Sequence, residues 1–480
     1  MDKEPIWVYN LQPKTEIRAE MQYIMRIEKD SLGVIEIPDE AYYGVQSIRA
    51  QQNFPLSHQT MLPEMIESLA EIKKAAAMAN HMAGSLSVEY RDAIIAACNE
   101  ILEGKLHDQF VVDPIQGGAG TSANMNANEV IANRATELLG GKKGAYIVHP
   151  NDHVNMSQST NDVFPSAGKL TTLKLVNRLI LALDSLISAL YSKAEEFKDI
   201  VKLGRTQLQD AVPVRLGQEF AAYAKALERG VGRIRHARKE MLVLNMGATA
   251  IGTSINATEE YVENVCRVLA YEIGENFVQA EDLVDATQNP DGFVEVSGAI
   301  KNCALIMSKI SNDLRLLSSG PRGGFEEIKL PARQHGSSIM PGKINPVMPE
   351  VVSQVAFRIV GNDTTICMAA EAGQLELNAF EPILFHSLFE SINLLRRVSV
   401  VFEEYCVDGI EADEEACMRN LMNSTAVATA LCPVIGYEEA TKIVKTALHE
   451  GRNIKDVAAE QLGKPIEEID AIFRSAIENC

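Results

Sequence analysis

Residues 296–317 read VSGAIKNCALIMSKISNDLRLL, and this stretch decides the fold. Its apolar positions are spaced alternately by four and three residues: Val296, Ile300, Cys303, Met307, Ile310, Leu314 and Leu317. Such a repeat places the side chains in one stripe along a helix that packs almost parallel to its neighbours. The stretch therefore predicts a long helix in a bundle.

The same pattern recurs farther towards the N-terminus. The apolar positions of this second stretch are Leu173, Val176, Ile180, Leu183, Ile187 and Leu190. A third stretch, 216–244, is rich in alanine and charged residues and also predicts a helix. Short runs with period-two alternation are scarce, so few strands are expected. The predicted fold class is mainly α, a central bundle of long helices with smaller, mostly helical caps.

Both stripes are accompanied by a second apolar face, formed by Leu179 and Leu186 in one helix and by Leu305 and Leu316 in the other. A helix that is apolar on two sides is buried in a large bundle or in a subunit interface. An obligate oligomer is therefore expected.

The chain contains no clear linker, low-complexity tract or internal repeat. Domain breaks are therefore placed in the loops at 140–154 and 407–414. They give an N-terminal domain at 1–160, a central long-helix domain at 161–412 and a small helical C-terminal domain at 413–480.

The charge balance excludes several classes of partner. The 480 residues include 45 basic and 65 acidic side chains, a formal charge of −20. A protein this negative is repelled by nucleic acid and by anionic lipid, so neither is an expected partner. If the substrate is itself an anion, its site must be locally positive.

The cysteines and the N-terminal segment indicate where the protein resides. None of the eight cysteines forms a C-x-x-C pair, so no zinc or redox site is expected and the thiols are predicted to be reduced core residues. Residues 1–20 carry charges throughout and lack the apolar region of a secretory signal. A cytoplasmic protein is expected.

Four polar, glycine-bearing segments interrupt the helical pattern. The first, 116–129, is QGGAGTSANMNANE, and its glycines let the backbone approach a ligand. Thr121 and Ser122 are expected to cap the helix that follows, and a helix N-terminus flanked by hydroxyl groups binds anions. An ordinary capped loop explains this segment alone equally well.

The second segment, 149–162, is HPNDHVNMSQSTND. Ser159, Thr160 and Asn161 are expected to cap a long helix beginning near Phe164, and they offer neutral donors for a carboxylate.

The third segment, 204–213, is GRTQLQDAVP and precedes a helix. Thr206 and Gln207 contribute uncharged hydrogen-bonding groups. Taken alone, the segment would be interpreted as a plain polar loop.

The fourth segment, 336–346, is GSSIMPGKINP and superficially resembles a phosphate-binding P-loop. That motif requires a glycine where Ser337 stands, and a serine or threonine where Ile344 follows Lys343. Both requirements fail, so nucleotide binding is not expected. A surface turn is the plain alternative.

Together the four segments supply hydroxyls, amides and one lysine. They contain no Ser-His-Asp grouping, no metal-ligand cluster and no dinucleotide fingerprint. This inventory suits a small, multiply anionic and unphosphorylated molecule.

The same segments resemble the signatures of the aspartase/fumarase superfamily. GSSIMPGKINP is similar to that family's GSSxMPxKxN pattern, and residues 120–130 and 157–162 resemble two further signature regions. Residues 26–33 and 41–46 resemble the start of family members. The resemblance runs from about residue 26 to near the C-terminus, and it implies three domains around a central bundle of long helices.

Within the superfamily the resemblance is closest to the aspartate ammonia-lyases. Fumarases typically carry a histidine at the position of Gln207, although some aspartases do so as well. The Ser-Thr-Asn-Asp and Ala-Tyr-Tyr-Gly segments favour the same branch. The implied reaction is reversible deamination of L-aspartate to fumarate. A fumarate hydratase or another lyase of the superfamily is the alternative, and a catalytically silent helical scaffold is a more distant one.

The resemblance also implies roles for individual residues. Ser337 would remove the proton from C3 of aspartate, and loop N–H groups and Lys343 would stabilise its alkoxide. The remaining implied substrate contacts are Thr121, Ser159, Thr160 and Ser338 around the β-carboxylate, Lys343 and Asn345 on the α-carboxylate, and Asn161, Thr206 and Gln207 at the amino group.

Family members use no cofactor for this chemistry and assemble each active site from three subunits of a homotetramer, so both properties are expected here. Residues 1–25 depart from the pattern, and Met25 stands where many members begin. An extended or misassigned start is therefore expected.

Overall fold

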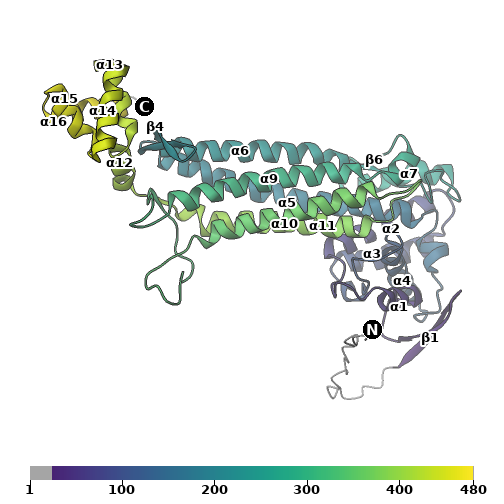
Figure 1. Cartoon of the computed structure of the whole chain (residues 1–480). Coiled ribbons are helices and arrows are strands. Elements are labelled where there is room, and N and C mark those ends of the chain that lie inside the picture. The colour runs from purple at the N-terminus through teal and green to yellow at the C-terminus, as the bar shows by residue number, and fades with distance from the viewer. Residues whose placement is uncertain (1–23, 479–480) are drawn as a thin grey trace, which may run out of the picture.

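The computed structural model describes residues 24–478 and is mainly helical, which confirms the predicted class (Figure 1). Its centre is a bundle of long helices that run side by side. These are α5 (Thr160–Glu196), α6 (Leu216–Ala237), α9 (Asp291–Leu317), α10 (Val347–Glu371) and α11 (Glu381–Tyr405). Smaller, mostly helical parts lie at the two ends of the bundle (Figure 1).

The apolar stripe of residues 296–317 lies inside the bundle. Val296, Cys303 and Leu314 of α9 are buried, and α9 packs against α6, α10 and α11. Burying such a stripe along a helix is the main source of its stability, because isolated helices are marginal in water. The prediction of a long bundle helix is confirmed.

The second apolar faces of the two helices differ in their surroundings. Leu179 and Leu186 of α5 are fully buried within the chain. On α9, by contrast, Leu305 is 48% exposed, and Phe357 on neighbouring α10 is 68% exposed. The single chain therefore leaves part of its apolar bundle surface uncovered.

One end of the bundle carries the N-terminal elements. They are β1 (Met25–Asp30), β2 (Gly33–Pro38), α1 (Val45–Asn53), α2 (Pro63–Met82), α3 (Val88–Leu102) and α4 (Thr121–Leu138), with α7 (Glu259–Ile273) packed on α2. The strands β1 and β2 form an antiparallel hairpin. Buried Glu129 of α4 accepts hydrogen bonds from the backbone N–H groups of Gly44, Gln46 and Ser47, which ties the start of α1 to α4.

The other end carries the C-terminal helices. They are α12 (Glu414–Met422), α13 (Cys432–Ile435), α14 (Tyr437–Glu450), α15 (Ile454–Leu462) and α16 (Ile466–Glu478). Their apolar residues form a separate cluster that Leu203 joins from a neighbouring strand. The short strands β7 (Ile328–Lys329) and β8 (Glu411–Ala412) pair beside them.

Two sequence predictions are corrected by the fold. The helix expected over 216–244 ends at Ala237, and the chain continues through a 3-10 turn into β5 (Val243–Leu244), whose backbone pairs with β6 (Val278–Gln279). The segment 204–213 is not a plain loop but belongs to a hairpin of β3 (Val201–Thr206) and β4 (Gln209–Arg215). A two-stranded sheet tolerates Pro213, because its edges need no N–H donor there.

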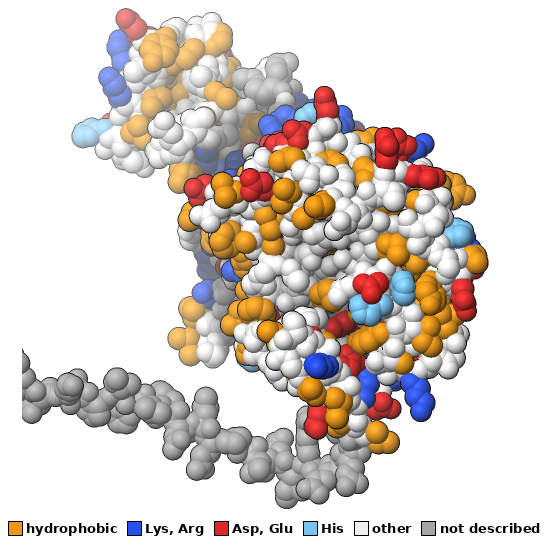
Figure 2. All heavy atoms as spheres, turned by 90° about the vertical axis from the view of Figure 1, so that its right-hand side faces the viewer, with side chains coloured by type: hydrophobic (Ala, Val, Ile, Leu, Met, Phe, Trp, Pro, Cys, Tyr) orange, Lys and Arg blue, Asp and Glu red, His pale blue; other side chains and the backbone are white. Residues whose placement is uncertain are grey.

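The surface of the N-terminal end mixes the two charges. In Figure 2, lysine and arginine side chains are scattered among acidic and hydrophobic ones and form no continuous basic patch.

Across residues 24–478, no helix combines the length and the apolar character that crossing a bilayer requires. The cysteines described are free thiols, most of them buried. The expectation about the start of the chain falls largely on residues 1–23, outside the described residues.

Candidate active site

The start of α5 is fixed by the residues that the sequence singled out. Ser159 is the N-cap, and its Oγ accepts a hydrogen bond from the backbone N–H of Asn161 at 3.2 Å. The N–H of Ser159 in turn donates to Asp162 at 2.9 Å, which completes a capping box. The helix therefore begins at Thr160, earlier than the position near Phe164 that was expected.

The glycine-rich segment leads directly into α4. Gly120, with a φ of 86°, is the N-cap, so Thr121 is the first helical residue and does not cap the helix as expected. A Cβ on Gly120 would clash with the ring of Phe164 from α5. Glycine is therefore required here both for the left-handed backbone and for the close approach of the two helices.

Side chains from α4 and α5 meet in a cleft. Asn124 Nδ2 donates to Thr160 Oγ1 at 3.1 Å and to Asn155 Oδ1 at 3.2 Å. Ser159 and Thr160 line the cleft together with Asn124 and Thr249. The structure thus brings the first two predicted segments into one place.

Two polar atoms of this cleft lack partners. Asn124 Oδ1 and Thr249 Oγ1 are buried, and no hydrogen bond to either is found in the described part of the chain. Thr249 also adopts a φ of 57°, which is strained for a β-branched residue. Buried polar groups are normally hydrogen-bonded, so unpaired ones in a strained cleft indicate a ligand site.

Sequence reasoning missed two parts of this cleft. The segment 245–256, which contains Thr249, is not among the four polar segments predicted from the sequence. Lys73 of α2 was overlooked as well, although it interrupts an apolar stripe that includes Ile66 and Leu69. A charge inside the buried face of a helix was the signal that could have revealed it.

Lys73 brings positive charge beneath the cleft. It is fully buried, and its Nζ donates to Asn155 Oδ1 at 2.8 Å and to Gln158 Oε1 at 2.9 Å. Burial lowers the pKa of Lys73 to about 7. Burial likewise raises the pKa of Asp162 to about 7, against the opposing effect of three backbone N–H donors. Both groups are thus poised to titrate near neutrality.

Asn161 is held by the backbone around it. The side-chain Nδ2 of Asn161 donates to the backbone carbonyl of Ala250 at 2.7 Å. The backbone carbonyl of Asn161 accepts a hydrogen bond from Asn245 Nδ2 at 3.0 Å. These contacts fix the orientation of the amide while leaving its Oδ1 available as an acceptor.

Thr206 and Gln207 lie at the tip of the β3–β4 hairpin. Thr206 pairs with Gln209, so Gln207 and Leu208 form a two-residue turn, with φ values of 54° and 63°. This turn normally favours Asn-Gly, because both central residues need a left-handed backbone. The neighbouring Arg205 forms an ion pair at 2.8 Å with fully buried Glu327.

The strained turn leads to a stability prediction. Leu208 is 65% exposed, so replacing it with glycine removes little burial and relieves the left-handed strain. We expect Leu208→Gly to raise the free energy of unfolding by about 1 kcal/mol. Urea unfolding of wild type and variant measures the change. Leu208→Ala is the matched control, and an equal gain from alanine would show that strain is not the cause.

The fourth predicted segment lies in the long connection between α9 and α10. Ser337 Oγ accepts hydrogen bonds from the backbone N–H groups of Ile339, at 3.2 Å, and Met340, at 3.0 Å. Asn345 Nδ2 donates to Gly336 O at 2.8 Å, and this bond closes the loop. Two N–H donors directed at one serine oxygen stabilise negative charge on it.

The remaining residues of this loop face solvent. Ser338 and Lys343 are exposed, and the apolar Ile339 is 84% exposed. Lys343 is held to the loop through its backbone, since Gly336 N–H donates to Lys343 O at 2.8 Å. Its side chain is therefore available to a ligand or to another subunit.

One chain does not bring all the predicted residues together. The helix α5 has 37 residues, so its ends lie about 55 Å apart. Thr121, Ser159, Thr160 and Asn161 lie at its start, whereas Thr206 and Gln207 follow its end (Figure 1). The Arg205–Glu327 ion pair shows that the connection carrying Ser337, Ser338, Lys343 and Asn345 starts at that second end.

Comparisons with known families find relatives that match almost the whole chain. A family model described as Lyase matches residues 33–361, and one described as Fumarase C C-terminus matches residues 427–476. An aspartate ammonia-lyase of Bacillus subtilis (strain 168) is 52% identical over 449 residues, which cover 93% of this chain and 94% of that protein. The aspartate ammonia-lyase of Escherichia coli (strain K12) is 47% identical over 94% of this chain and 95% of its own length.

Solved structures with the same architecture also resemble this chain. A crystal structure described as fumarate lyase:delta crystallin from Brucella melitensis bound to cobalt has a TM-score of 0.91 at 49% identity, covering 94% of this chain and 98% of that one. A recombinant class II fumarase from Schistosoma mansoni has a TM-score of 0.89 at 36% identity, with the same coverage.

Proposed function

The chain belongs to the lyase family of the aspartase/fumarase superfamily, and we propose that it is a carbon–nitrogen lyase that reversibly deaminates L-aspartate to fumarate and ammonia. The observation that carries the proposal is the likeness to aspartate ammonia-lyases along almost the whole chain. The orphaned polar atoms of the cleft at the start of α5 support a binding site for a small polar ligand there.

Ser337 is proposed to be the base. A serine oxygen removes a proton from carbon only as an alkoxide, which needs stabilisation. The N–H groups of Ile339 and Met340 already donate to this oxygen and would strengthen their hydrogen bonds as its charge develops. Transfer of the C3 proton to Ser337 leaves an enediolate on the β-carboxylate of aspartate.

Stabilising that enediolate is the task proposed for the hydroxyl donors. The residues are Thr121, Ser159, Thr160 and Ser338. Donors placed where charge develops lower the barrier, and losing one typically costs about 10²- to 10³-fold in turnover. Buried Lys73 supports this role, because its Nζ donates to Asn155 and Gln158 beneath the cleft and carries positive charge there when it is protonated.

The other end of the substrate is assigned to different groups. Lys343 and Asn345 are proposed to hold the α-carboxylate, and Asn161, Thr206 and Gln207 the ammonium group. Amide and hydroxyl oxygens can bind the ammonium group as hydrogen-bond acceptors, because its nitrogen is already protonated. When the C2–N bond breaks, the electron pair goes to nitrogen and ammonia leaves without a strong general acid. No step of this scheme calls on a cofactor.

A shared active site follows from the separation within one chain. Because the donors and the base lie at opposite ends of α5, we propose a homotetramer in which each site combines segments of three subunits. The exposed apolar residues of α9 and α10 support such an interface. The division into domains at 1–160, 161–412 and 413–480 is part of the same proposal.

The decisive experiment mixes purified protein with L-aspartate and follows fumarate by its ultraviolet absorbance. A parallel reaction contains L-malate, the substrate of a fumarate hydratase. We expect fumarate to form from aspartate only. Fumarate from malate alone would replace the proposal with the hydratase, to which the likeness to a fumarase gives some support.

A further inference from the structure

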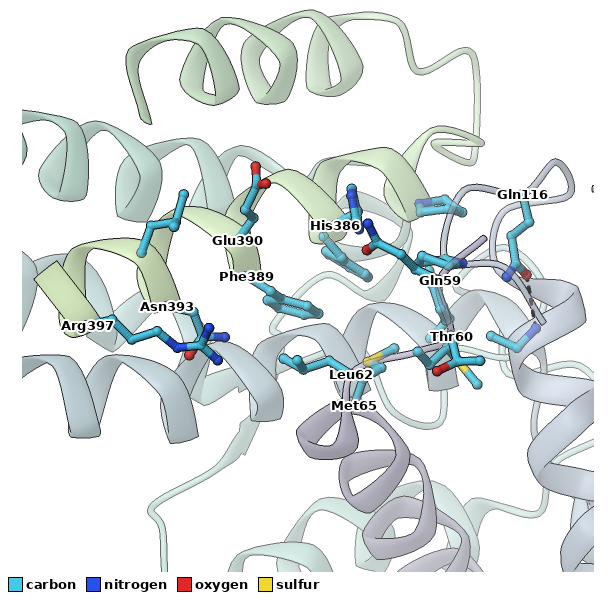
Figure 3. Close-up of a pocket in the computed structure, with 17 residues that line it drawn as sticks. Gln59, Thr60, Leu62, Met65, Gln116, His386, Phe389, Glu390, Asn393 and Arg397 are labelled. Atoms are coloured by element: carbon cyan, nitrogen blue, oxygen red, sulfur yellow. Dashed lines mark hydrogen bonds between the residues drawn. The ribbon is translucent and has the colours of Figure 1, made fainter. Parts of the chain in front are cut away.

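A second cavity near the start of α5 shares no lining residue with the substrate cleft. It opens between α11, the first turns of α5 and residues 59–65, and its volume is about 350 Å³ (Figure 3). Its apolar lining consists of Met61, Leu62, Met65, Phe164, Phe385 and Phe389. Cavities of this size hold small organic molecules.

Aromatic rings dominate this lining. Phe385 packs against Phe164 with ring centroids 5.2 Å apart, and against Phe389 at 5.8 Å. The thioethers of Met61 and Met65 complete the wall, and sulfur makes favourable contacts with aromatic rings. An aromatic ring of a ligand is therefore the apolar group that this wall fits best.

The polar rim contains groups that are not used within the chain. In Figure 3, Arg397 lies beside Asn393 at one end of the cavity, and His386 and Gln59 lie towards the other end. Among the described residues, none of these four side chains has a hydrogen-bond or ion-pair partner. Arg397 is exposed, so a ligand reaches its guanidinium from solvent.

The only acidic side chain of the lining does not neutralise Arg397. Glu390 Oε2 instead accepts hydrogen bonds from Arg358 Nε at 2.9 Å and from Asn362 Nδ2 at 2.7 Å. The cavity thus combines an aromatic wall with one unopposed cation. A guanidinium recognises a carboxylate through paired, charge-assisted hydrogen bonds.

We propose that this cavity is an effector site for an aromatic monocarboxylate, which places its ring on Phe385 and Phe389 and its carboxylate on Arg397. The chemistry differs from that of the substrate cleft, which offers hydroxyls and amides for a small dicarboxylate. Aspartate and fumarate lack an apolar body and would leave the aromatic wall without a partner.

The wall between the two sites links them. Phe164 lines the effector cavity, and its ring is the group that Gly120 packs against just before Thr121. In the first turn of α4, Ala123 lines the effector cavity while the next residue, Asn124, lines the substrate cleft and donates to Thr160. Occupancy of the cavity therefore alters the packing that positions Thr121 and Thr160, and this part of the inference rests on the proposed function.

Calorimetric titration of the intact oligomer with 3-phenylpropionate tests the site independently of turnover. We expect one saturable site per chain, and binding of the neutral 3-phenylpropanamide about 10- to 100-fold weaker, because it lacks the charge for Arg397. Arg397→Met should weaken binding of the acid by a similar factor. Arg229→Met is the matched control, because Arg229 lies outside the cavity and, among the residues that the structure describes, donates only to the backbone carbonyl of Lys225 in its own helix.

A second variant fills the cavity instead of removing its charge. Leu394, which also lines it, is replaced by tryptophan, and Leu394→Trp should abolish binding while leaving the thermal midpoint of unfolding close to that of wild type. Absence of saturable heat would overturn the proposal. Displacement of the probe by fumarate, or binding that both variants retain, would place the probe elsewhere and overturn it equally.

Steady-state kinetics with L-aspartate measure whether binding in the effector cavity changes catalysis. Saturating 3-phenylpropionate should change kcat or KM of wild type at least twofold in a pattern that added aspartate does not reverse, and it should leave Arg397→Met unaffected. Unchanged kinetics of a saturated enzyme would overturn the effector role. Failure of the proposed function would appear separately, as protein that binds the probe but turns over no aspartate.

Discussion

Replacing Ser337 with alanine is expected to lower kcat for L-aspartate by about 10³- to 10⁴-fold, while KM stays within a few-fold of wild type. The side chain belongs to none of the apolar clusters, and within residues 24–478 its oxygen accepts hydrogen bonds only from the backbone N–H groups of Ile339 and Met340. Its loss therefore removes the proposed base without disturbing the fold. A fall in kcat without a rise in KM is the kinetic mark of an interaction made mainly in the transition state.

Steady-state assays over a range of aspartate concentrations measure both constants. Gln334→Ala is a suitable control, because Gln334 is an exposed residue of the same connection and makes no hydrogen bond among residues 24–478. Size-exclusion chromatography and circular dichroism check that the variant assembles and folds. A loss smaller than tenfold would assign the base to another residue.

Two variants that are each inactive are expected to recover activity when their subunits are mixed. Ser337→Ala removes the base at one end of α5, and Thr160→Val removes a donor at the other. Subunits are separated, mixed in equal amounts and reassembled. If base and donor of one site come from different chains, roughly a quarter of the sites receive both intact residues by random assortment. Activity should rise from near zero to about that fraction of wild type.

The assay is the same fumarate measurement, made before and after reassembly. Each variant reassembled alone is the control and must stay inactive. Mixing Ser337→Ala with Lys343→Ala provides a matched comparison, because both substitutions lie on one loop and no assortment can restore it. Absence of recovery in the first mixture, from protein shown to have exchanged subunits, would contradict the shared site.

The bundle could be predicted from the sequence because its signal is periodic. The spacing from Val296 to Leu317 specifies a stripe, and the α9 stripe is buried as expected. The capping prediction succeeded for Ser159, whose side chain binds the next turn. The capping prediction was wrong for Thr121. Gly120 is the N-cap instead, because only a residue without a Cβ fits against the ring of Phe164. Packing between segments distant in sequence therefore determines where α4 begins, and a local sequence pattern does not predict such packing.

The hairpin at Thr206 was missed for a related reason. Gln207 and Leu208 are poor residues for a left-handed turn, so local preference argued against the turn that the structure contains. Strain of this kind persists where the surrounding structure enforces it, as the buried Glu327 does through Arg205. Sequence patterns therefore fail where contacts between distant segments override local preference.

The cleft residues found only in the structure illustrate a further limit. Asn124 belonged to a segment already chosen, but Thr249 and Lys73 come from regions distant in sequence. Their meeting depends on the packing of α2 and of the 245–256 segment around the start of α5. Resemblance to a family implied the candidate roles, whereas the unpaired atoms of the cleft arise from the folded structure and leave no trace in the sequence.

The exposed apolar side chains of the bundle have a consequence for the newly synthesised chain. Leu305, Phe357 and Met368 are 48%, 68% and 64% exposed in the single chain. In the proposed homotetramer other subunits would cover this surface, so a newly synthesised copy would expose it until assembly and would be prone to non-specific association. The yield of soluble enzyme should therefore depend on how quickly synthesis supplies partners and on the chaperones available meanwhile. Slow expression at low temperature is the practical remedy.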